Sequence, residues 1–135
     1  MRVYLVRHAE AAPGEPDEFR PLTAAGKRAA RELGGRIAAD GKLDAVVTSP
    51  LLRARETGAA IARETGVAAA TVAEGLAPGA TSESLLAAVA GRGARVAVVA
   101  HQPDCSQIAG ALTGSEVPFA PGDMLAIELE LEPAV

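Results

Sequence analysis

Two apolar runs that each end in a histidine constrain the fold of this chain most strongly. Residues 3–6 (VYLV) are followed by Arg7 and His8, and residues 96–100 (VAVVA) are followed by His101. Short runs with β-branched and aromatic members are typical of strands that are buried on both faces. Because the chain has only these two histidines, both imidazoles are expected at the ends of buried strands.

The carboxyl ends of parallel strands form the edge at which open α/β sheets bind their ligands. Two imidazoles delivered to this edge, one of them beside an arginine, indicate a site for an anion. The alternative is that both are ordinary strand-end histidines whose ring nitrogens pair with neighbouring groups. That alternative explains one such histidine readily and two together poorly.

The rest of the chain alternates helical and strand patterns. Helices are expected over about 23–41, 49–65, 81–91 and 102–114, and further strands over 43–48, 67–72 and 124–131. Thr23 should cap the first helix, and its apolar stripe should be Ala25, Ala29, Leu33 and Ile37. Ser49 followed by Pro50 should cap and start the second helix. Residues 9–21, rich in proline and acids, should form a loop over the sheet's carboxyl edge.

This order of elements predicts the fold class. It indicates a three-layer α/β/α sandwich around a mostly parallel sheet of about five strands, with right-handed crossovers. The last strand, 124–131, alternates with a period of two at its end, so it should have one solvated face and lie at an edge of the sheet. The 135 residues suffice for a single domain spanning 1–135.

Composition and charge exclude several classes of partner. The chain has no Trp, one Tyr and two Phe, which argues against the aromatic platforms that stack nucleic-acid bases. A net charge of −4 without a Lys/Arg run argues against nucleic acid and anionic membranes. The single Cys105 excludes an internal disulfide, and the first apolar run is too short for a signal peptide. We therefore expect a cytoplasmic protein.

Several familiar sites do not match the sequence. There is no glycine-rich phosphate loop and no Gly-x-Ser-x-Gly elbow. Cys105 is not followed by an arginine at the distance that a cysteine phosphatase needs. His8, His101 and Cys105 could be three metal ligands, but Cys105 falls on the apolar stripe of its helix. We expect neither a metal nor a cofactor.

Nucleophilic catalysis by histidine remains. The free nitrogen of a neutral imidazole can attack phosphorus to give a phosphohistidine, and arginines can hold the phosphoryl oxygens that carry the charge in the transition state. Besides Arg7, the candidates are Arg53 and Arg55 in the first turns of the second predicted helix. Periodicity alone does not choose between them, and both could be solvated surface charges.

Four segments of the chain resemble the histidine phosphatase (phosphoglycerate-mutase-like) superfamily in the same order. They are LVRHAE (5–10), RPLTAAG (20–26), TSPLLRARET (48–57) and VVAH (98–101). The short length, the RPLT segment and the Leu-x-Pro-Gly loop at 76–79 are most similar to the SixA-type phosphohistidine phosphatases. Where the family has Arg-His-Gly, this chain has Arg-His-Ala.

The resemblance implies roles for particular residues. It makes His8 the nucleophile, and it completes a phosphate cage with Arg7, Arg53 and His101. Arg53 matches rather than Arg55 because it is the arginine of Leu-x-Arg-Ala. Arg20 is implied as a contact to the substrate or its phosphate.

The proton donor has two candidates. Glu74 lies about where larger members of the family present a carboxylic acid, and Glu10 is closer in sequence to the nucleophile. Either could instead be a solvated loop charge. A protonated phosphoramidate nitrogen leaves readily as neutral imidazole, so an enzyme for phosphohistidine manages with a weak acid or none.

We therefore expect a phosphatase that acts on the phosphohistidine of a phosphotransfer protein, such as a His-containing phosphotransfer domain. The sequence between Arg53 and His101 leaves no long insertion for a lid, so the site should be open to a protein substrate. One alternative is a phosphatase for small phosphomonoesters. Another is a non-catalytic phosphate-binding module, which would need arginines and backbone donors but no histidine pair.

Overall fold

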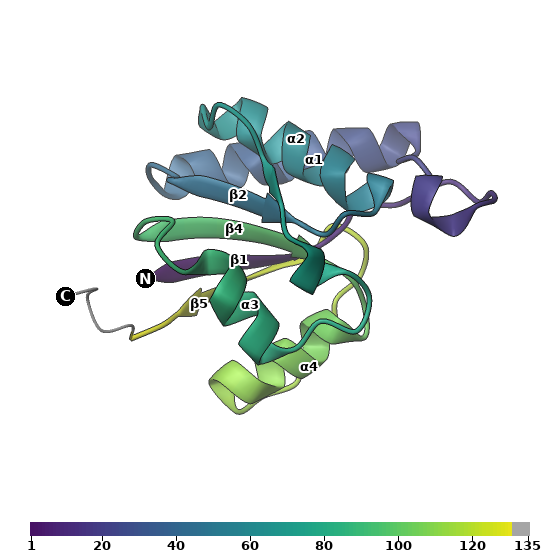
Figure 1. Cartoon of the computed structure of the whole chain (residues 1–135). Coiled ribbons are helices and arrows are strands. Elements are labelled where there is room, and N and C mark those ends of the chain that lie inside the picture. Colours follow the sequence, from purple (N-terminus) through teal and green to yellow (C-terminus); the bar gives the residue numbers. More distant parts are fainter. Residues whose placement is uncertain (131–135) are drawn as a thin grey trace.

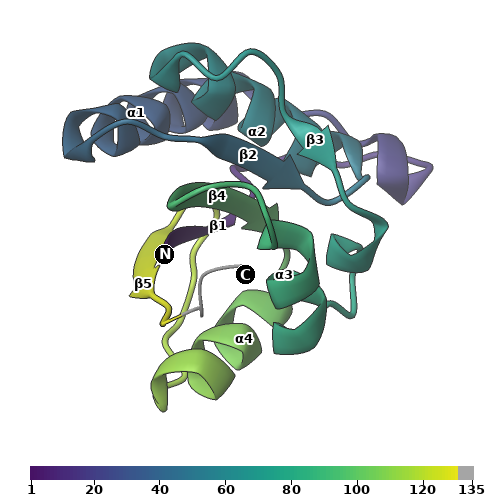
Figure 2. The same cartoon turned by 60° about the vertical axis from the view of Figure 1, so that its left-hand side comes forward.

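The computed structural model of the chain describes residues 1–130, and three layers are visible in it (Figures 1 and 2). The strands are β1 (Arg2–Arg7), β2 (Ala45–Thr48), β3 (Thr71–Val72), β4 (Arg95–Ala100) and β5 (Met124–Glu128). The helices are α1 (Ala24–Asp40), α2 (Leu52–Thr65), α3 (Ser82–Val89) and α4 (Asp104–Thr113), with short 3-10 turns η1 (Asp17–Phe19) and η2 (Glu74–Leu76).

The five strands form one sheet in the order β3-β2-β4-β1-β5. The pairs β1–β4, β2–β4 and β2–β3 are parallel, whereas β5 runs antiparallel to β1 at an edge. The predicted α/β/α fold class and the C-terminal edge strand are therefore confirmed. The last predicted residue of that strand, Leu131, lies outside the described residues.

The sheet is buried on both faces because each central strand contributes side chains to two apolar layers. Helices α1 and α2 cover one face and α3 and α4 the other (Figures 1 and 2). Leu5 packs in the same cluster as Ile108 of α4, while the next residue, Val6, packs in the same cluster as Ile61 of α2. This alternation explains why the strand patterns are continuously apolar rather than alternating.

The buried stripe of α1 differs from the prediction in its first half. It consists of Gly26, Ala30, Leu33, Gly34 and Ile37. Ala25 is exposed and Ala29 is half-buried, so these two predicted positions were wrong. The buried face of the helix differs from the predicted one because Gly26 faces the loop after His8. An added Cβ at Gly26 would lie 2.2 Å from the carbonyl oxygen of Glu10.

The start of α2 also corrects the sequence analysis. Ser49 does not cap the helix, which begins at Leu52 with Leu51 as a cap residue that makes no side-chain bond. The Ser49 hydroxyl instead accepts from the backbone N–H of Leu51 and lies 2.7 Å from Nε2 of His101. The Ser-Pro pair thus shapes the turn that leads into the helix.

Other predicted elements are present with shorter bounds. Strand β2 begins at Ala45 rather than at residue 43, and β3 covers only Thr71–Val72 of the predicted 67–72. Thr23 caps α1 through its side chain, as predicted, and Thr81 caps α3 in the same way. None of the helices within residues 1–130 combines the length and the apolar character needed to cross a membrane.

Candidate active site

The register of the parallel strands places the two histidines side by side. Beyond the ends of the strands, the backbone N–H of His8 donates to Ala100 O at 3.1 Å, and that of Ser49 donates to Val99 O at 3.0 Å. The residues that directly follow β1, β2 and β4 therefore emerge at one edge of the sheet. The imidazole centroids of His8 and His101 are 5.2 Å apart, with the rings tilted by 55°.

The hydrogen bond of His8 defines its tautomer. Its Nδ1 lies 2.8 Å from the carbonyl oxygen of Ala9, and a carbonyl oxygen only accepts hydrogen bonds. In the neutral ring, Nδ1 therefore carries the proton and Nε2 keeps its lone pair. This is the arrangement that a nucleophilic imidazole requires.

Burial and nearby positive charge keep both imidazoles neutral. Burial lowers the pKa of His8, opposed by its bond to Ala9, and the charges of Arg53, Arg7 and Arg20 lower it further. Burial, followed by the neighbouring His8 and Arg53, lowers the pKa of His101 to about 4. At neutral pH the site therefore presents two uncharged imidazoles among cations.

Arg53 and Arg7 approach the histidines from different elements. Arg53 is buried in the first turn of α2, and it donates to the backbone oxygen and the carboxylate of Asp17 at 2.9 and 3.2 Å. Arg7, at the end of β1, donates to Phe119 O at 2.8 Å. Within residues 1–130, Arg7 Nε and His101 Nδ1 are buried without a hydrogen-bond partner. Such atoms are rare in folded proteins, and an oxyanion is able to pair with them.

Arg20 belongs to this cluster and Arg55 does not. Arg20 donates to Ala12 O at 2.8 Å and to the carboxylate of Asp17 at 3.0 Å, and its charge acts on His8. Arg55 is exposed, donates to Pro50 O at 2.9 Å and lines a separate cavity of about 520 Å³ beside β3. The structure therefore brings Arg7, Arg20 and Arg53 to the histidines.

The family model for the histidine phosphatase superfamily (branch 1) matches residues 3–77. This chain belongs to the histidine phosphatase superfamily. The family assignment predicted from the four sequence motifs is thus confirmed. An uncharacterised protein of Picosynechococcus sp. is 33% identical to the chain over 120 residues, which cover 83% of this chain and 73% of that protein.

Solved structures of histidine phosphatases are similar to the chain over most of its length. The structure of the protein histidine phosphatase SixA complexed with tungstate superposes with a TM-score of 0.86 at 25% identity, covering 96% of this chain and 89% of that one. A putative phosphohistidine phosphatase SixA from Agrobacterium tumefaciens gives a TM-score of 0.71 at 31% identity, covering 84% and 77%. These similarities support phosphatase activity for the chain.

The departure from the family's Arg-His-Gly is accommodated by packing. Ala9 is fully buried and shares an apolar cluster with Leu22 and Ala30, so its methyl group has a place in the core. Its backbone N–H donates to Thr57 Oγ1 at 3.1 Å, and that hydroxyl donates in turn to Arg53 O at 2.8 Å. Thr57 thus ties the residue after the nucleophile to the helix that carries Arg53.

Sequence reasoning missed several residues that shape the site. Thr57, Ser49 and Asp17 each bond directly to a candidate residue or its backbone, as described above. Glu56 accepts from Leu22 N at 2.8 Å and so fixes the end of the loop that follows His8. In the sequence, the only indication of a role for these residues was that Ser49, Glu56 and Thr57 lie in the same family motif as Arg53.

The two candidate proton donors have different surroundings. Glu74 is the first residue of η2 and is exposed, and its side chain makes no hydrogen bond or ion pair within residues 1–130. Glu10 accepts from the hydroxyl of Thr23 at 2.8 Å at the start of α1. The carboxylate of Glu10 is therefore engaged by a helix cap, whereas Glu74 keeps the role of a predicted donor.

Cys105 lies in the core rather than in the site. Its thiol is fully buried, burial raises its pKa to about 12, and its Sγ lies 3.8 Å from Val6 O. The neighbouring Asp104 accepts from the backbone N–H groups of Gly79 and Ala80, which holds the Leu-x-Pro-Gly loop against the start of α4. Within residues 1–130 no three His, Cys, Asp or Glu side chains are grouped to hold a metal ion.

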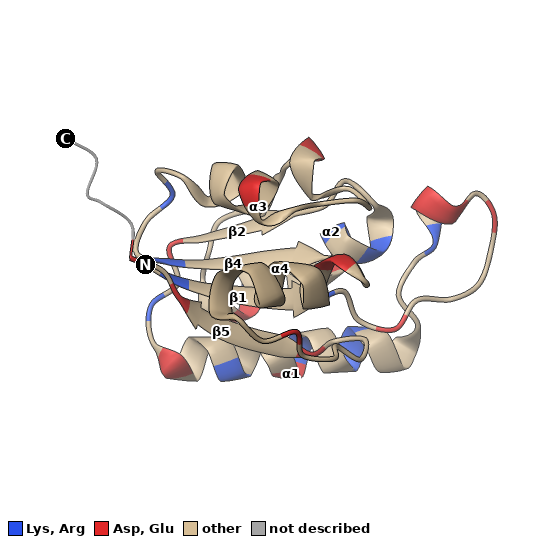
Figure 3. Cartoon of the chain, turned by 90° about the horizontal axis from the view of Figure 1, so that it is seen from below, with Lys and Arg blue, Asp and Glu red and all other residues tan. Residues whose placement is uncertain are grey.

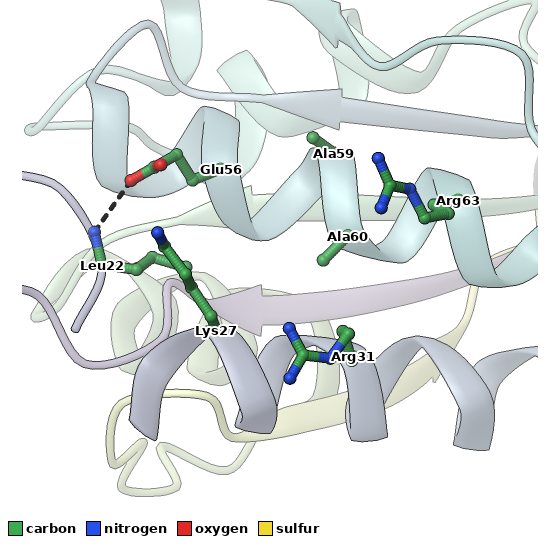
Figure 4. Close-up of a pocket in the computed structure, with 7 residues that line it drawn as sticks. All are labelled: Leu22, Lys27, Arg31, Glu56, Ala59, Ala60 and Arg63. Carbon is green, nitrogen blue, oxygen red and sulfur yellow. Dashed lines mark hydrogen bonds between the residues drawn. The ribbon is translucent and has the colours of Figure 1, made fainter. Parts of the chain in front are cut away.

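A cavity of about 220 Å³ lies between α1 and α2, apart from the histidines (Figure 4). It is lined by Leu22, Lys27, Arg31, Glu56, Ala59, Ala60 and Arg63. Its carboxylate, Glu56, is directed at the backbone N–H of Leu22 (Figure 4). Because this lining includes none of the candidate catalytic residues, we treat it as a surface groove of the helical layer.

Proposed function

We propose that the chain is a phosphohistidine phosphatase, which removes the phosphoryl group from a histidine of a partner protein such as a His-containing phosphotransfer domain. The observation that carries the proposal is the pair of neutral imidazoles, His8 and His101, 5.2 Å apart beside the buried Arg53. A site that only binds phosphate needs no free imidazole nitrogen, whereas a nucleophile does.

His8 forms the covalent intermediate in this mechanism. Its Nε2 attacks phosphorus while the bond from phosphorus to the substrate's imidazole nitrogen breaks, and that imidazole leaves neutral because its other nitrogen is protonated. His8 retains the Nδ1 proton that it donates to Ala9. A water molecule then attacks phosphorus and the bond to Nε2 breaks. Phosphate leaves as H₂PO₄⁻ with the oxygen and both protons of the water, and His8 returns to its neutral form.

Arg7, Arg53 and His101 bind the phosphoryl oxygens in both steps. Their cationic and N–H groups stabilise the charge that spreads over these oxygens in the transition state. Arg20 contacts the phosphoryl group or the substrate at the rim. No metal or cofactor takes part in the proposed steps.

The choice of a protein substrate rests on the shape of the chain around the site. Between α2 and α3, the described residues hold only the two-residue β3 and the 3-10 turn η2, which are too short to fold over the histidines as a lid. A phosphohistidine on a protein surface can approach such a site, and its leaving group requires little help from Glu74. We place the reaction in the cytoplasm, where an unpaired thiol such as that of Cys105 remains reduced.

A steady-state comparison of two substrates tests the proposal. We expect a larger kcat/KM for a phosphohistidine-bearing phosphotransfer protein than for a small phosphomonoester such as p-nitrophenyl phosphate. Rapid quenching with labelled substrate should trap an acid-labile, base-stable phosphoenzyme that is lost in His8→Ala. Efficient hydrolysis of the ester with no activity on the phosphoprotein would overturn the substrate assignment, and binding without turnover would favour the phosphate-binding module.

A further inference from the structure

We propose that Asp17 is an internal competitor for the phosphoryl group, whose carboxylate occupies Arg53 and Arg20 until the substrate displaces it. This inference rests on the proposed function, in which these two arginines contact the phosphoryl group or the substrate. It adds a residue that controls how tightly the site holds its substrate and its product.

The geometry shows one carboxylate shared between two cations of the site. Oδ2 of Asp17 accepts from Arg53 at 3.2 Å, and Oδ1 accepts from Arg20 at 3.0 Å. The backbone oxygen of Asp17 accepts from Arg53 as well, at 2.9 Å. Carboxylate and phosphoryl oxygens use the same guanidinium N–H groups, so Asp17 holds donors that an incoming phosphoryl group requires.

The two partners of this ion pair differ in their freedom to move. The side chain of Arg53 is 9% exposed, whereas that of Asp17 is 58% exposed. Asp17 begins the three-residue turn η1, which buries none of its residues, on a loop that projects beyond the carboxyl edge of the sheet (Figure 3). Since exposed turns with few buried contacts open at low free-energy cost, Asp17 is the partner that leaves.

The exchange favours the phosphoryl group for a physical reason. A phosphoryl dianion carries more charge than a carboxylate, and it gains Arg7 and His101, to which Asp17 makes no hydrogen bond. The arginines keep the pKa of Asp17 below its usual value, so the competitor stays ionised at neutral pH. After hydrolysis, Asp17 re-forms its ion pairs and promotes release of inorganic phosphate.

A role of Asp17 in orienting Arg53 would give the opposite result in a binding experiment. If Asp17 competes, Asp17→Asn tightens the binding of inorganic phosphate and of vanadate. If Asp17 only orients Arg53, the same substitution loosens both. The sign of the change therefore separates the two roles.

The experiment measures inhibition constants of phosphate and vanadate for the full chain and its variants. We expect Asp17→Asn and Asp17→Ala to lower both constants about threefold to tenfold, the range expected for two partly exposed ion pairs that share one carboxylate. Glu18→Gln is the matched control, because it removes the same charge from the adjacent residue, which makes no ion pair within residues 1–130. It should change either constant by less than about twofold.

Three results would contradict different parts of the account. If Asp17→Asn leaves the inhibition constants unchanged or raises them, the competitor role is overturned and the proposed phosphatase activity is not affected. A wild-type chain that neither binds phosphate nor hydrolyses phosphohistidine overturns the proposed function, and the competitor role with it. An equal tightening in Glu18→Gln would assign the effect to net charge and also overturn the specific role of Asp17.

Discussion

The two ends of the central sheet differ in how their charged side chains are paired. At the amino end, Asp40 accepts from Arg2 and Arg95, each at 2.8 Å, and from the hydroxyl of Tyr4. Arg2 also pairs with Glu128. Charges of both signs are thus matched there within the chain itself.

At the carboxyl end, Arg20 and Arg53 pair with the carboxylate of Asp17, and within residues 1–130 Arg7 and the two histidines have no carboxylate partner. Two buried nitrogens in the same cluster, on Arg7 and His101, have no partner within residues 1–130, whereas at the amino end Arg95 Nε also lacks one but its guanidinium is paired with Asp40 through another nitrogen. The amino end therefore contributes to stability, and the carboxyl end keeps an excess of donors for an anion. Unmatched polar groups of this kind concentrate at functional sites.

Removing an arginine from each end should give the largest difference in kcat/KM between the two ends. Arg53→Ala removes a buried donor to the phosphoryl oxygens, so kcat/KM should fall about 10²–10³-fold. Arg95→Ala, at the amino end, and Arg55→Ala, two residues along α2, should leave kcat/KM within about twofold at a temperature where both variants are folded. Steady-state kinetics with circular dichroism checks this. Equal losses in Arg53→Ala and Arg55→Ala would contradict the site.

The next largest effect is expected in the pH dependence of the free energy of unfolding. Burial keeps His101 neutral down to about pH 4, whereas in the unfolded chain it takes up a proton near its ordinary pKa of 6.5. The free energy of unfolding should therefore fall as the pH drops from 6.5 toward 4, by up to about 3 kcal/mol from this group. Urea unfolding at several pH values should show a smaller fall in His101→Asn. Parallel curves for the two proteins would contradict the buried, neutral imidazole.

The smallest effect is expected at the amino end. Tyr4→Phe keeps the buried ring but removes the hydroxyl that bonds to Asp40 and Arg95, which should cost about 1 kcal/mol of stability. Its kcat/KM should match that of the wild type. Urea unfolding and steady-state kinetics measure the two quantities. A loss of activity in the folded variant would show that the two ends are coupled.

The sequence predicted the features that depend on local pattern. The apolar runs before His8 and His101 located β1 and β4, and the alternation of elements located the helical layers and the edge strand. Parallel pairing then brings the ends of those strands together, because the register continues directly into both histidines. The motif that contains Arg53 distinguished it from Arg55.

The remaining features depend on contacts between distant segments. Gly26 faces the loop after His8, where the Glu10 carbonyl lies against it, and helical periodicity does not predict such a contact. Ser49 bonds to a histidine 52 positions away, although its place before Pro50 is typical of a helix cap. In the sequence, Asp17 is one of several acids in a loop, and only the fold shows that it pairs with Arg53.

The most direct test of the central claim is to locate the phosphoryl group on the trapped enzyme. Phosphorus and nitrogen NMR of the chain, labelled with nitrogen-15 in histidine and phosphorylated by its substrate, would identify both the residue and the ring nitrogen. Because Nδ1 of His8 is bonded to Ala9, the account predicts phosphorylation at Nε2 of His8. A phosphoryl group on Nδ1, on His101 or on neither histidine during turnover would contradict it.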